Sequence, residues 1–517
     1  MLQRQRSKSI ILLSESDLMQ ETQNKNYKSI LKGSAIFGGT QIFTILVNLF
    51  RAKAIAVFLG PSGMGISALL TSAANTIQQF SSLGINLTAV KDVAQLSEIS
   101  DKNEIINRLS YIRLLCFCLA TFGTIICLLF AVQLSKLTFG NQNYTYHFRF
   151  LSIFIFFTIS SAGELSILQG NKKLKKIAVG SIVSAGSGLI VGVPLYYFMR
   201  TEGIVPGMIS LSLSSYLTFF YHNRDNFYFK KIFFPENFHL FWSSSKRLIG
   251  LGVILMISTL IGTLVTYLLN IFITDNGGVG DVGFFQAANS LTNQYIGLVF
   301  TAMAIDYFPR LAAVSHEKEK INEVVNSQLE IVLLLVAPLV TTFMLFSPLI
   351  IKILLTEKFL LILPLLNAMA LGAFFKAASY PLGYISFAKG DQKVFFWLEG
   401  ILGNLLQISL NILFYCFFGL VGLGFSFIAI YVLYLLIIGA VTKKVYHFSF
   451  NEISIKLIIL LGGGCIFVYL INTLVENLVA KYIVGASATI FLIYFCTVEI
   501  NKRVNFSEYL RTKLKKK

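Results

Sequence analysis

The chain has 517 residues, of which 55% are hydrophobic and 13% are charged, and its mean hydropathy is +0.71. A soluble protein carries about 25% charged residues, so this composition excludes a water-soluble fold. The net charge of +18 would suit a nucleic-acid-binding protein, but the Lys and Arg residues are spread over many short segments instead of one face. We therefore expect an integral membrane protein with no nucleic-acid partner.

The hydrophobic residues form runs long enough to cross a membrane. A spanning helix needs about 20 apolar residues, because lipid cannot satisfy exposed backbone polar groups. Residues 1–26 are rich in Ser, Gln and Asn, which predicts a disordered cytoplasmic tail. After this tail the candidate spans are, in chain order, Gly33–Phe50, Ala54–Val90, Leu114–Ser135, Phe150–Gln169, Ile177–Met199, Gly203–Tyr221, Leu248–Thr274, Val282–Ile305, Ile331–Ile351, Phe359–Ala388, Gly400–Thr442, Leu457–Val475 and Tyr482–Val498. Because Gly400–Thr442 is long enough for two spans, we expect an all-α membrane protein with about 14 transmembrane helices.

The Lys and Arg residues indicate the orientation of these spans. If the N-terminus is cytoplasmic and the spans alternate, most Lys and Arg residues fall in the inside segments. One short inside loop holds four lysines between Lys172 and Lys176, and the inside tail ends with the basic run Lys513–Lys517. Cytoplasmic loops of membrane proteins carry such an excess, so we expect both termini to be cytoplasmic.

Cysteine, histidine and glycine motifs indicate no bound cofactor. The six cysteines lie inside predicted spans and the five histidines are scattered singly, so no metal or disulfide site is expected. Gly278–Gly283 matches the dinucleotide-binding pattern, but it joins two membrane spans instead of a strand and a helix. No GxxxxGK[ST] motif is present, so we expect no ATP hydrolysis by the chain itself.

An internal repeat predicts the organisation of the spans. The run Asn103–Asn107 (Asn-Glu-Ile-Ile-Asn) recurs 219 residues later as Asn322–Asn326 (Asn-Glu-Val-Val-Asn), and Gly65 corresponds to Gly283 at nearly the same spacing. The unit contains six spans, so the second copy enters the membrane in the same orientation as the first. This predicts two parallel six-helix lobes related by an axis along the membrane normal. The predicted segments are a tail (1–26), a first lobe (27–222), a cytoplasmic linker (223–247), a second lobe (248–445), an extra helix pair (446–500) and a basic tail (501–517).

Amide side chains recur at three- and four-residue steps in four of the spans, which places them on one face of each helix. The candidate substrate-binding amides are Asn48 in the first span, Asn75 and Gln78 in the second, Asn289 and Asn293 in the eighth, and Asn404 and Gln407 in the eleventh. Interhelical hydrogen bonding is one interpretation. Since both lobes contribute such faces, we favour a shared, water-filled cavity.

Ionisable residues inside the spans are the remaining candidates. A charge at bilayer depth costs about 3 kcal/mol on insertion scales, so such a residue is a functional candidate. Lys376 lies near the middle of the tenth span, and Arg51 and Lys53 lie near the outer end of the first. We expect Lys376 and Arg51 to contact an anionic substrate, the alternatives being a structural pair for Lys376 and snorkelling to head groups for Arg51. Lys53 is a further substrate-binding candidate, for which snorkelling is the favoured interpretation. The candidates for ion coupling or gating are Asp306, Arg310 and Glu164, and Glu164 ranks with Glu399 below the other two. Asp306 and Arg310 are also spaced for a simple i, i+4 ion pair.

Three motifs resemble a known family of transporters. Leu59–Gly65 resembles the first outer loop of O-antigen flippases, and Asp306–Leu311 is similar to the Tyr-x-Pro-Arg-Leu ending of their eighth helix. Gly372–Gly390 resembles their tenth helix, with Lys376 at the basic position. The resemblance extends from Tyr27 to Lys444. These flippases belong to the multidrug/oligosaccharidyl-lipid/polysaccharide exporter superfamily.

The resemblance implies a function for the whole chain. Such a protein moves an oligosaccharide linked to polyprenyl pyrophosphate from the inner to the outer leaflet of the bacterial inner membrane. We expect a transporter in contact with membrane lipids, without cofactors or enzymatic activity. Since the chain has no ATP site, a proton or sodium gradient is the candidate energy source, although no residue identifies the coupling ion. We expect a monomer that associates with polysaccharide assembly proteins.

Two other functions are compatible with parts of the sequence. A multidrug cation antiporter of the same superfamily would need buried carboxylates in its cavity, whereas the deepest charge here is Lys376. A membrane-embedded polysaccharide polymerase or ligase would need a large outer loop with catalytic groups. No outer loop is much longer than Lys136–Phe148.

Overall fold

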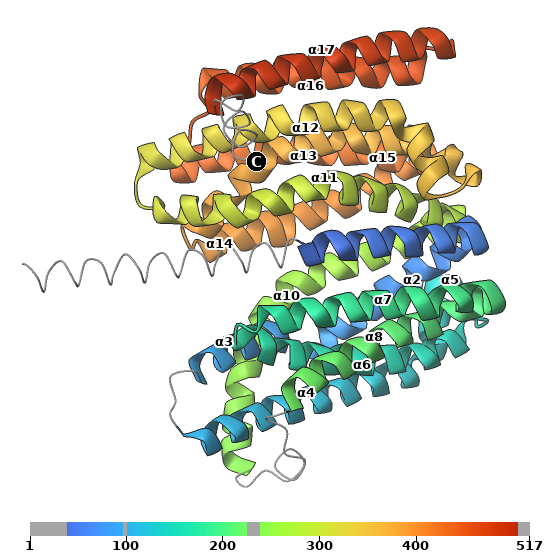
Figure 1. The fold of residues 1–517 in the computed structure, drawn as a ribbon, viewed down its shortest axis with the longest axis vertical. Helices are drawn as coiled ribbons and strands as arrows, with labels where there is room; N and C mark the ends of the chain where they lie inside the picture. The colour runs from blue at the N-terminus through green and yellow to red at the C-terminus, as the bar shows by residue number, and fades with distance from the viewer. Residues whose placement is uncertain (1–38, 97–100, 225–237, 505–517) are drawn as a thin grey trace, which may run out of the picture.

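The computed structural model describes residues 39–96, 101–224 and 238–504, and every regular element in these ranges is a helix (Figure 1). This confirms the predicted all-α class. The predicted tail of residues 1–26 and all but the first four residues of the basic tail, 501–517, lie outside the described residues.

The first half of the chain forms one group of packed helices. Its elements are the helix Gly39–Phe58, α2 (Gly60–Ser82), α3 (Ile85–Leu96), α4 (Lys102–Leu129), α5 (Ala131–Phe139), α6 (Thr145–Gly170), α7 (Leu174–Met199), the 3₁₀ turn η1 (Arg200–Gly203) and α8 (Ile204–Asn223). Helix α6 lies between α4 and α8, and α7 packs on α8. Figure 1 shows α3, α4, α6, α7 and α8 together in the lower part of the molecule.

The second half forms the upper group in Figure 1, apart from its first helix (Phe238–Gly277), which begins among the helices of the lower group. Its elements are α10 (Phe238–Gly277), α11 (Val279–Ala313), α12 (Lys318–Leu354), η3 (Glu357–Ile362), α13 (Leu363–Ala388), α14 (Gln392–Phe395), η4 (Phe396–Leu402), α15 (Gly403–Tyr446), α16 (Glu452–Leu474) and α17 (Leu478–Val504). Helix α13 is central, since it packs on α11, α12, α15 and α16. Helix α10 begins ten residues before the predicted start of the second lobe, so it includes part of the predicted linker 223–247.

Nine helical segments in the described part of the chain are long and apolar enough to cross a membrane. Two of them, Leu174–Asn223 and Gln392–Tyr446, have 50 and 55 residues, more than one crossing of about 20 residues needs. The first is interrupted by η1, and the second by Gly419. The φ of +59° and ψ of −142° at Gly419 lie in a region that only glycine adopts easily, so this position breaks α15 in two.

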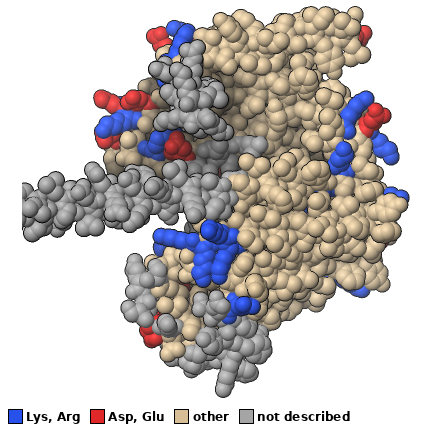
Figure 2. All heavy atoms as spheres, viewed as in Figure 1, with Lys and Arg blue, Asp and Glu red and all other residues tan. Residues whose placement is uncertain are grey.

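The surface agrees with a position inside a membrane. Figure 2 shows charged side chains near the two ends of the helices, with a broad uncharged surface between them. Large apolar side chains on this protein are well exposed, among them Phe198 and Ile190. Lipid would cover such side chains, whereas exposing so large an apolar area to water would be unfavourable.

A buried ion pair joins three helices of the first half. Arg113 on α4 donates to both carboxylate oxygens of Glu164 on α6, at 2.6 and 3.1 Å, and both residues are buried. Asn223, at the end of α8, donates from its amide to the Glu164 carboxylate at 2.8 Å. Because a buried charge needs a partner, this contact fixes α4, α6 and α8 relative to one another.

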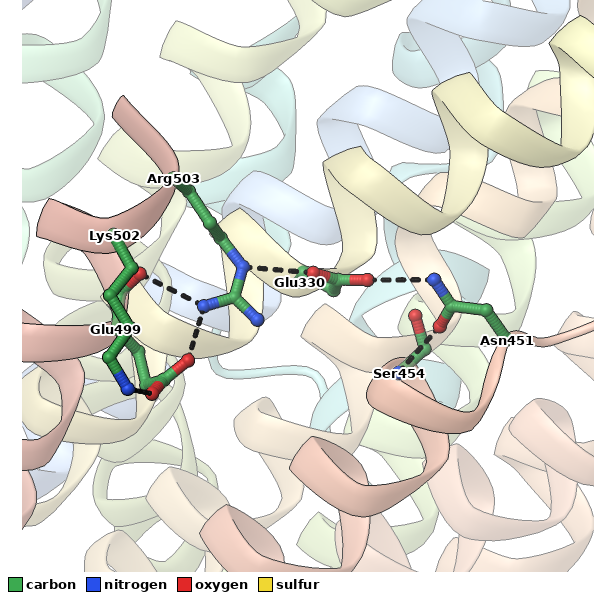
Figure 3. A network of polar contacts seen from close by, with 6 residues as sticks. All are labelled: Glu330, Asn451, Ser454, Glu499, Lys502 and Arg503. Carbon is green, nitrogen blue, oxygen red and sulfur yellow. Dashed lines mark hydrogen bonds and ion pairs between the residues drawn. The ribbon is translucent and has the colours of Figure 1, made fainter. Parts of the chain in front are cut away.

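A second polar network fastens α16 and α17 to the second half (Figure 3). Arg503, in the last turn of α17, donates to Glu330 of α12 at 2.9 Å and to Glu499 at 2.6 Å. On its other side the Glu330 carboxylate accepts from the amide of Asn451 at 2.9 Å, and Asn451 caps α16. The extra helix pair is therefore held to α12 at one end by hydrogen bonds to the buried Glu330 carboxylate and by a bond from the Asn451 backbone to Asn326.

This network predicts which charge matters for stability. Arg503→Ala should lower the thermal unfolding temperature of the solubilised protein, because Glu330 would lose its charged partner at a cost of about 1–3 kcal/mol. Lys502→Ala is the matched control, since exposed Lys502 also pairs with Glu499 at 2.7 Å and such exposed pairs contribute little. Equal effects of the two substitutions would contradict this account.

Candidate functional site

A polar cavity of about 680 Å³ lies where the two halves meet. The helix Gly39–Phe58 and α2 line one side, and α10 and α11 line the other. The polar residues around this first cavity include Asn48, Arg51, Thr71, Asn75, Thr263, Thr266, Asn270, Gln286 and Asn289. The cavity therefore combines one guanidinium group with a wall of amides and hydroxyls.

A second cavity, of about 350 Å³, adjoins the first. The two share the lining residues Thr266, Asn270, Gln286 and Asn289, so α10 and α11 stand between them and contribute to both. Its other polar residues come from α11, α13, η4 and α15, and they are Asn293, Lys376, Glu399, Asn404, Gln407, Asn411, Tyr431 and Tyr434.

A third, more aromatic cavity of about 470 Å³ continues from the second. The shared residues are Lys376, Glu399, Tyr431 and Tyr434. We call the three adjoining spaces the central cavity. It extends from the helix Gly39–Phe58 in the first half to α15 in the second, so a ligand inside it would contact both halves.

The amides along α11 support one another from within the helix. Asn293 donates to the side-chain oxygen of Asn289 at 2.7 Å, and Gln294 donates to Ser290 at 2.9 Å. These are i, i+4 contacts, so the period of the helix places the residues of each pair on the same face. An amide that donates one hydrogen bond along its own helix keeps further donor and acceptor positions for a ligand.

Lys376 lies deep in the central cavity and is surrounded by aromatic rings. Its ammonium lies 5.7 Å from the ring centre of Phe300 and 5.4 Å from that of Tyr431. Such cation–π contacts stabilise a cation in an apolar region by about 0.5–2 kcal/mol. Among the described residues, no carboxylate lies within ion-pair distance of this ammonium. Glu399 nevertheless lines the same cavity and accepts a hydrogen bond from the hydroxyl of Tyr434.

Arg51 is the cation of the first-half wall. It lines the first cavity together with Asn48, one turn earlier on the same helix. Within the described ranges the Arg51 guanidinium forms no ion pair with a carboxylate. Among its described lining residues, the central cavity thus contains two cations, Arg51 and Lys376, and one carboxylate, Glu399.

The structure brings together most of the predicted substrate-binding residues. Those that line the central cavity are Asn48, Arg51, Asn75, Asn289, Asn293, Lys376, Asn404 and Gln407. Gln78 is half-buried and is not among the lining residues. Lys53 points elsewhere, since its ammonium donates to the backbone oxygen of Ile353 at 2.6 Å.

The predicted ion-coupling residues do not line the central cavity. Asp306 and Arg310 form an i, i+4 ion pair of 2.8 Å, and Arg310 also donates to Gln328 of α12. Glu164 is held by Arg113, as described above. These contacts account for all three residues as members of ion pairs outside the central cavity.

Two contributors to the site were not selected from the sequence: the threonine-bearing face of α10, and Tyr434, the partner of the lower-ranked candidate Glu399. Helix α10 provides Thr259, Thr263, Thr266 and Asn270, spaced for one helical face. Threonine is common in apolar helices, where it donates back to its own turn, so this face was less distinct than the asparagine-rich ones. Glu399 and Tyr434 come together from positions 35 residues apart, a proximity that only the folded chain reveals.

Glycine contacts join the two halves at both ends of α2. A Cβ atom at Gly65 would lie 1.9 Å from the backbone oxygen of Val279, and one at Gly283 would lie 1.9 Å from that of Pro61. Beyond the other end of α2, a Cβ atom at Gly84 would lie 2.2 Å from the oxygen of Gly252. Real Cβ atoms do not approach so closely, so these backbones can touch only because the residues are glycine.

Comparison with known proteins identifies the family. Residues 54–364, more than half of the chain, match the family of polysaccharide biosynthesis proteins. The chain belongs to this family. It is 24% identical over 378 residues to a Shigella flexneri protein provisionally named as an O-antigen transporter, covering 71% of this chain and 86% of that one. It is 22% identical over 415 residues to the lipid III flippase of Escherichia coli (strain K12), covering 78% and 96%.

Solved structures share the fold. The lipid II flippase MurJ, in an inward closed conformation, has a TM-score of 0.69 at 18% identity, covering 91% of this chain and 99% of that one. An inward-facing multidrug transporter of the MATE family has a TM-score of 0.64 at 16% identity, covering 78% and 96%. With the family match, these findings confirm the predicted membership of the exporter superfamily as a flippase-type, multi-pass protein of the bacterial inner membrane. The named relatives are transporters and not enzymes, as expected.

The glycine contacts give a prediction for the closure of the cavity. Gly283→Ala should keep α2 and α11 apart, because the new Cβ would collide with backbone and not with a flexible side chain. Gly280→Ala is the matched control, since its Cβ would meet nothing closer than the hydroxyl of Ser62 at 4.0 Å. In a cysteine-free background carrying Ser290→Cys, an impermeant thiol reagent added on one side of the membrane should label this cysteine faster in the Gly283→Ala protein than in the Gly280→Ala protein. Equal labelling of both variants would contradict a closing contact here.

Proposed function

We propose that the protein is a flippase that moves an oligosaccharide on polyprenyl pyrophosphate, an O-antigen unit or a related repeat, from the cytoplasmic to the periplasmic leaflet. The single observation that carries this proposal is the central cavity, in which Arg51 and Lys376 stand among amide-bearing helices. Membership of the polysaccharide biosynthesis family and the names of the relatives support the same class of substrate.

The cations suit the pyrophosphate. A pyrophosphate cannot cross hydrocarbon alone, so a transporter must supply fixed positive charge along its path. Charge-assisted hydrogen bonds from Arg and Lys to phosphate oxygens are short and strong. Arg51 in the first half and Lys376 in the second could bind the anionic group in turn or together, and both lack a tightly bound carboxylate within the described ranges.

The remaining lining suits sugars. Hydroxyl groups of a glycan need many donors and acceptors, which Asn289, Asn404, Gln407 and their neighbours provide. Aromatic side chains such as Tyr431 and Tyr380 offer apolar surface to sugar rings in the third cavity. The polyprenyl tail would stay in the bilayer, between the two halves.

The carboxylate of Glu399 supports a second candidate function. A multidrug cation antiporter of the same superfamily would use a buried carboxylate to bind its substrate or a coupling ion, and Glu399 lines the cavity beside Lys376. Two cations against one carboxylate favour an anionic substrate, so we rank this candidate second. A polymerase or ligase finds no support among the relatives, whose names are those of transporters and flippases.

The finer architecture belongs to the same proposal. We infer fourteen spans in two parallel lobes, residues 27–222 and 248–445, that rock about the central cavity. The pair 446–500 follows them, and both termini are cytoplasmic. A proton or sodium gradient would supply the energy, and the working unit would be a monomer within a polysaccharide assembly system.

The charge at residue 376 tests the proposed substrate. Lys376→Ala should insert normally and abolish transport, Lys376→Arg should retain part of it, and Lys376→Glu should abolish it by repelling phosphate. The measurement is surface polysaccharide in a flippase-deleted strain, scored against membrane abundance. Lys53→Ala is the matched control, since Lys53 lies outside the central cavity.

Substitution of Glu399 distinguishes substrate binding by Lys376 from a purely structural role of Lys376. If Lys376 only neutralised Glu399, then Glu399→Gln would restore transport to the Lys376→Ala protein. If Lys376 binds the substrate anion, the double variant should stay inactive. Restored transport in the double variant, or full transport by Lys376→Ala alone at equal abundance, would contradict the proposed role.

The proposed topology has a test of its own. In a background without the six native cysteines, single cysteines at Asn141 and Asn276 should react with an impermeant reagent added to cells with a permeabilised outer membrane. Cysteines at Asn171 and Ser315 should react only after the inner membrane is opened. Labelling of Asn171 in the former cells would reverse the orientation inferred from the Lys and Arg residues.

A further inference from the structure

A cavity of about 800 Å³ lies apart from the central cavity, within the second half. The end of α12, η3, the start of α13, the part of α15 beyond Gly419, the end of α16 and the start of α17 surround it. It shares no lining residue with the three spaces of the central cavity. Nothing in the proposed transport path uses this outlying cavity.

Two buried asparagines line this space, and neither amide nitrogen donates to another described residue. Asn367 is 5% exposed, and its side-chain oxygen accepts from Ser347 at 3.0 Å, which leaves its amide nitrogen for the cavity. Asn472 is 8% exposed, and its amide nitrogen has no hydrogen-bond partner among the described residues. A buried amide donor without a partner costs about 1–3 kcal/mol, so a ligand that accepted from it would bind favourably.

Lys481 adds a cation to the two amides. Its ammonium donates to the backbone oxygen of Asn472 at 2.6 Å, which caps the end of α16. An ammonium has three N–H donors, and the cap uses one of them. Capping alone explains neither the remaining donors nor the two amides beside them. Three groups that donate hydrogen bonds, one of them charged, form a site for an anion with several oxygen atoms.

Most of the remaining lining is apolar, and exposed leucines stand at its edge. Leu360, Leu363 and Phe425 form its walls. Leu361 and Leu474, also in the lining, are each 73% exposed. A free inorganic anion would gain nothing from these walls, whereas a lipid would place its acyl chains on them.

The position of Lys481 matches the depth of a lipid head group. Helix α16 ends at Leu474 and α17 begins at Leu478, so Lys481 lies within the first turn of a membrane-spanning segment. At this depth a lysine side chain reaches the phosphates of the neighbouring leaflet. We propose that the outlying cavity binds the phosphate group of a membrane phospholipid through Lys481, Asn472 and Asn367, with its acyl chains on the apolar walls. Such a lipid would hold α16 and α17 against α12 and α13.

The test measures thermal unfolding of the purified full-length protein in detergent with added lipid. Phosphatidylglycerol should raise the unfolding temperature by several degrees, and diacylglycerol, which has the same chains without phosphate, should not. Inorganic phosphate should have no effect at the same concentration. Stabilisation by inorganic phosphate equal to that by the lipid would overturn the lipid as ligand and indicate a free-anion site.

Two variants locate the effect. Lys481→Gln should weaken the apparent affinity for phosphatidylglycerol at least tenfold, whereas Lys456→Gln, which removes an exposed lysine paired with Glu452 at the other end of α16, should not. Asn472→Asp is the second variant, because its carboxylate can pair with Lys481 and keep the protein folded while it repels phosphate. Undiminished lipid stabilisation in Asn472→Asp, or equal losses in Lys481→Gln and Lys456→Gln, would overturn the proposed site.

Discussion

Direct backbone contact between the two halves is the constraint on which the central cavity depends. At Gly65 and Gly283, and again at Gly84 and Gly252, the helices touch without side chains between them. These contacts lie at the two ends of α2 and fix its distance from α10 and α11. The polar side chains between them, such as Asn75 and Thr71, then face a space instead of packing into a core. The same residues on a more tightly packed helix pair would serve only as interhelical hydrogen bonds.

The charges in this space have different surroundings from the charges elsewhere in the protein. Arg113 and Glu164 satisfy each other at 2.6 Å in a buried pair, which makes them expensive to separate and unsuitable for a passing ligand. Lys376 is stabilised by ring faces at more than 5 Å, a weaker interaction that leaves its three donors free for an anion. This contrast explains why a buried ion can be structural in one helix and available for binding in another.

The sequence predicted the all-α class, the polar helix faces and the position of Lys376 within a span, because each of these depends on local order along the chain. A period of 3.6 residues determines which amides share a face, and charge-free runs indicate where helices cross lipid. It failed where partners are distant: Arg113 pairs with Glu164 across 51 residues, and Glu399 meets Tyr434 across 35. The structure also places the Lys53 ammonium at the backbone oxygen of Ile353 and not in the central cavity, because a long side chain can bend away from the face on which its Cα lies.

The role of the last two helices follows from how they are attached. Sequence alone left this pair without a function, since it lies outside the repeat. At one end, Glu330 binds Arg503 and Asn451, which ties α16 and α17 to α12 by charge. At the other end, the same helices enclose a cavity lined by Asn472, whose amide nitrogen has no hydrogen-bond partner among the described residues. Protein contacts thus hold α16 and α17 at one end, and a ligand bound at the other end would hold them against α12 and α13 there. The lipid surroundings would then contribute to the stability of the second half without entering the central cavity.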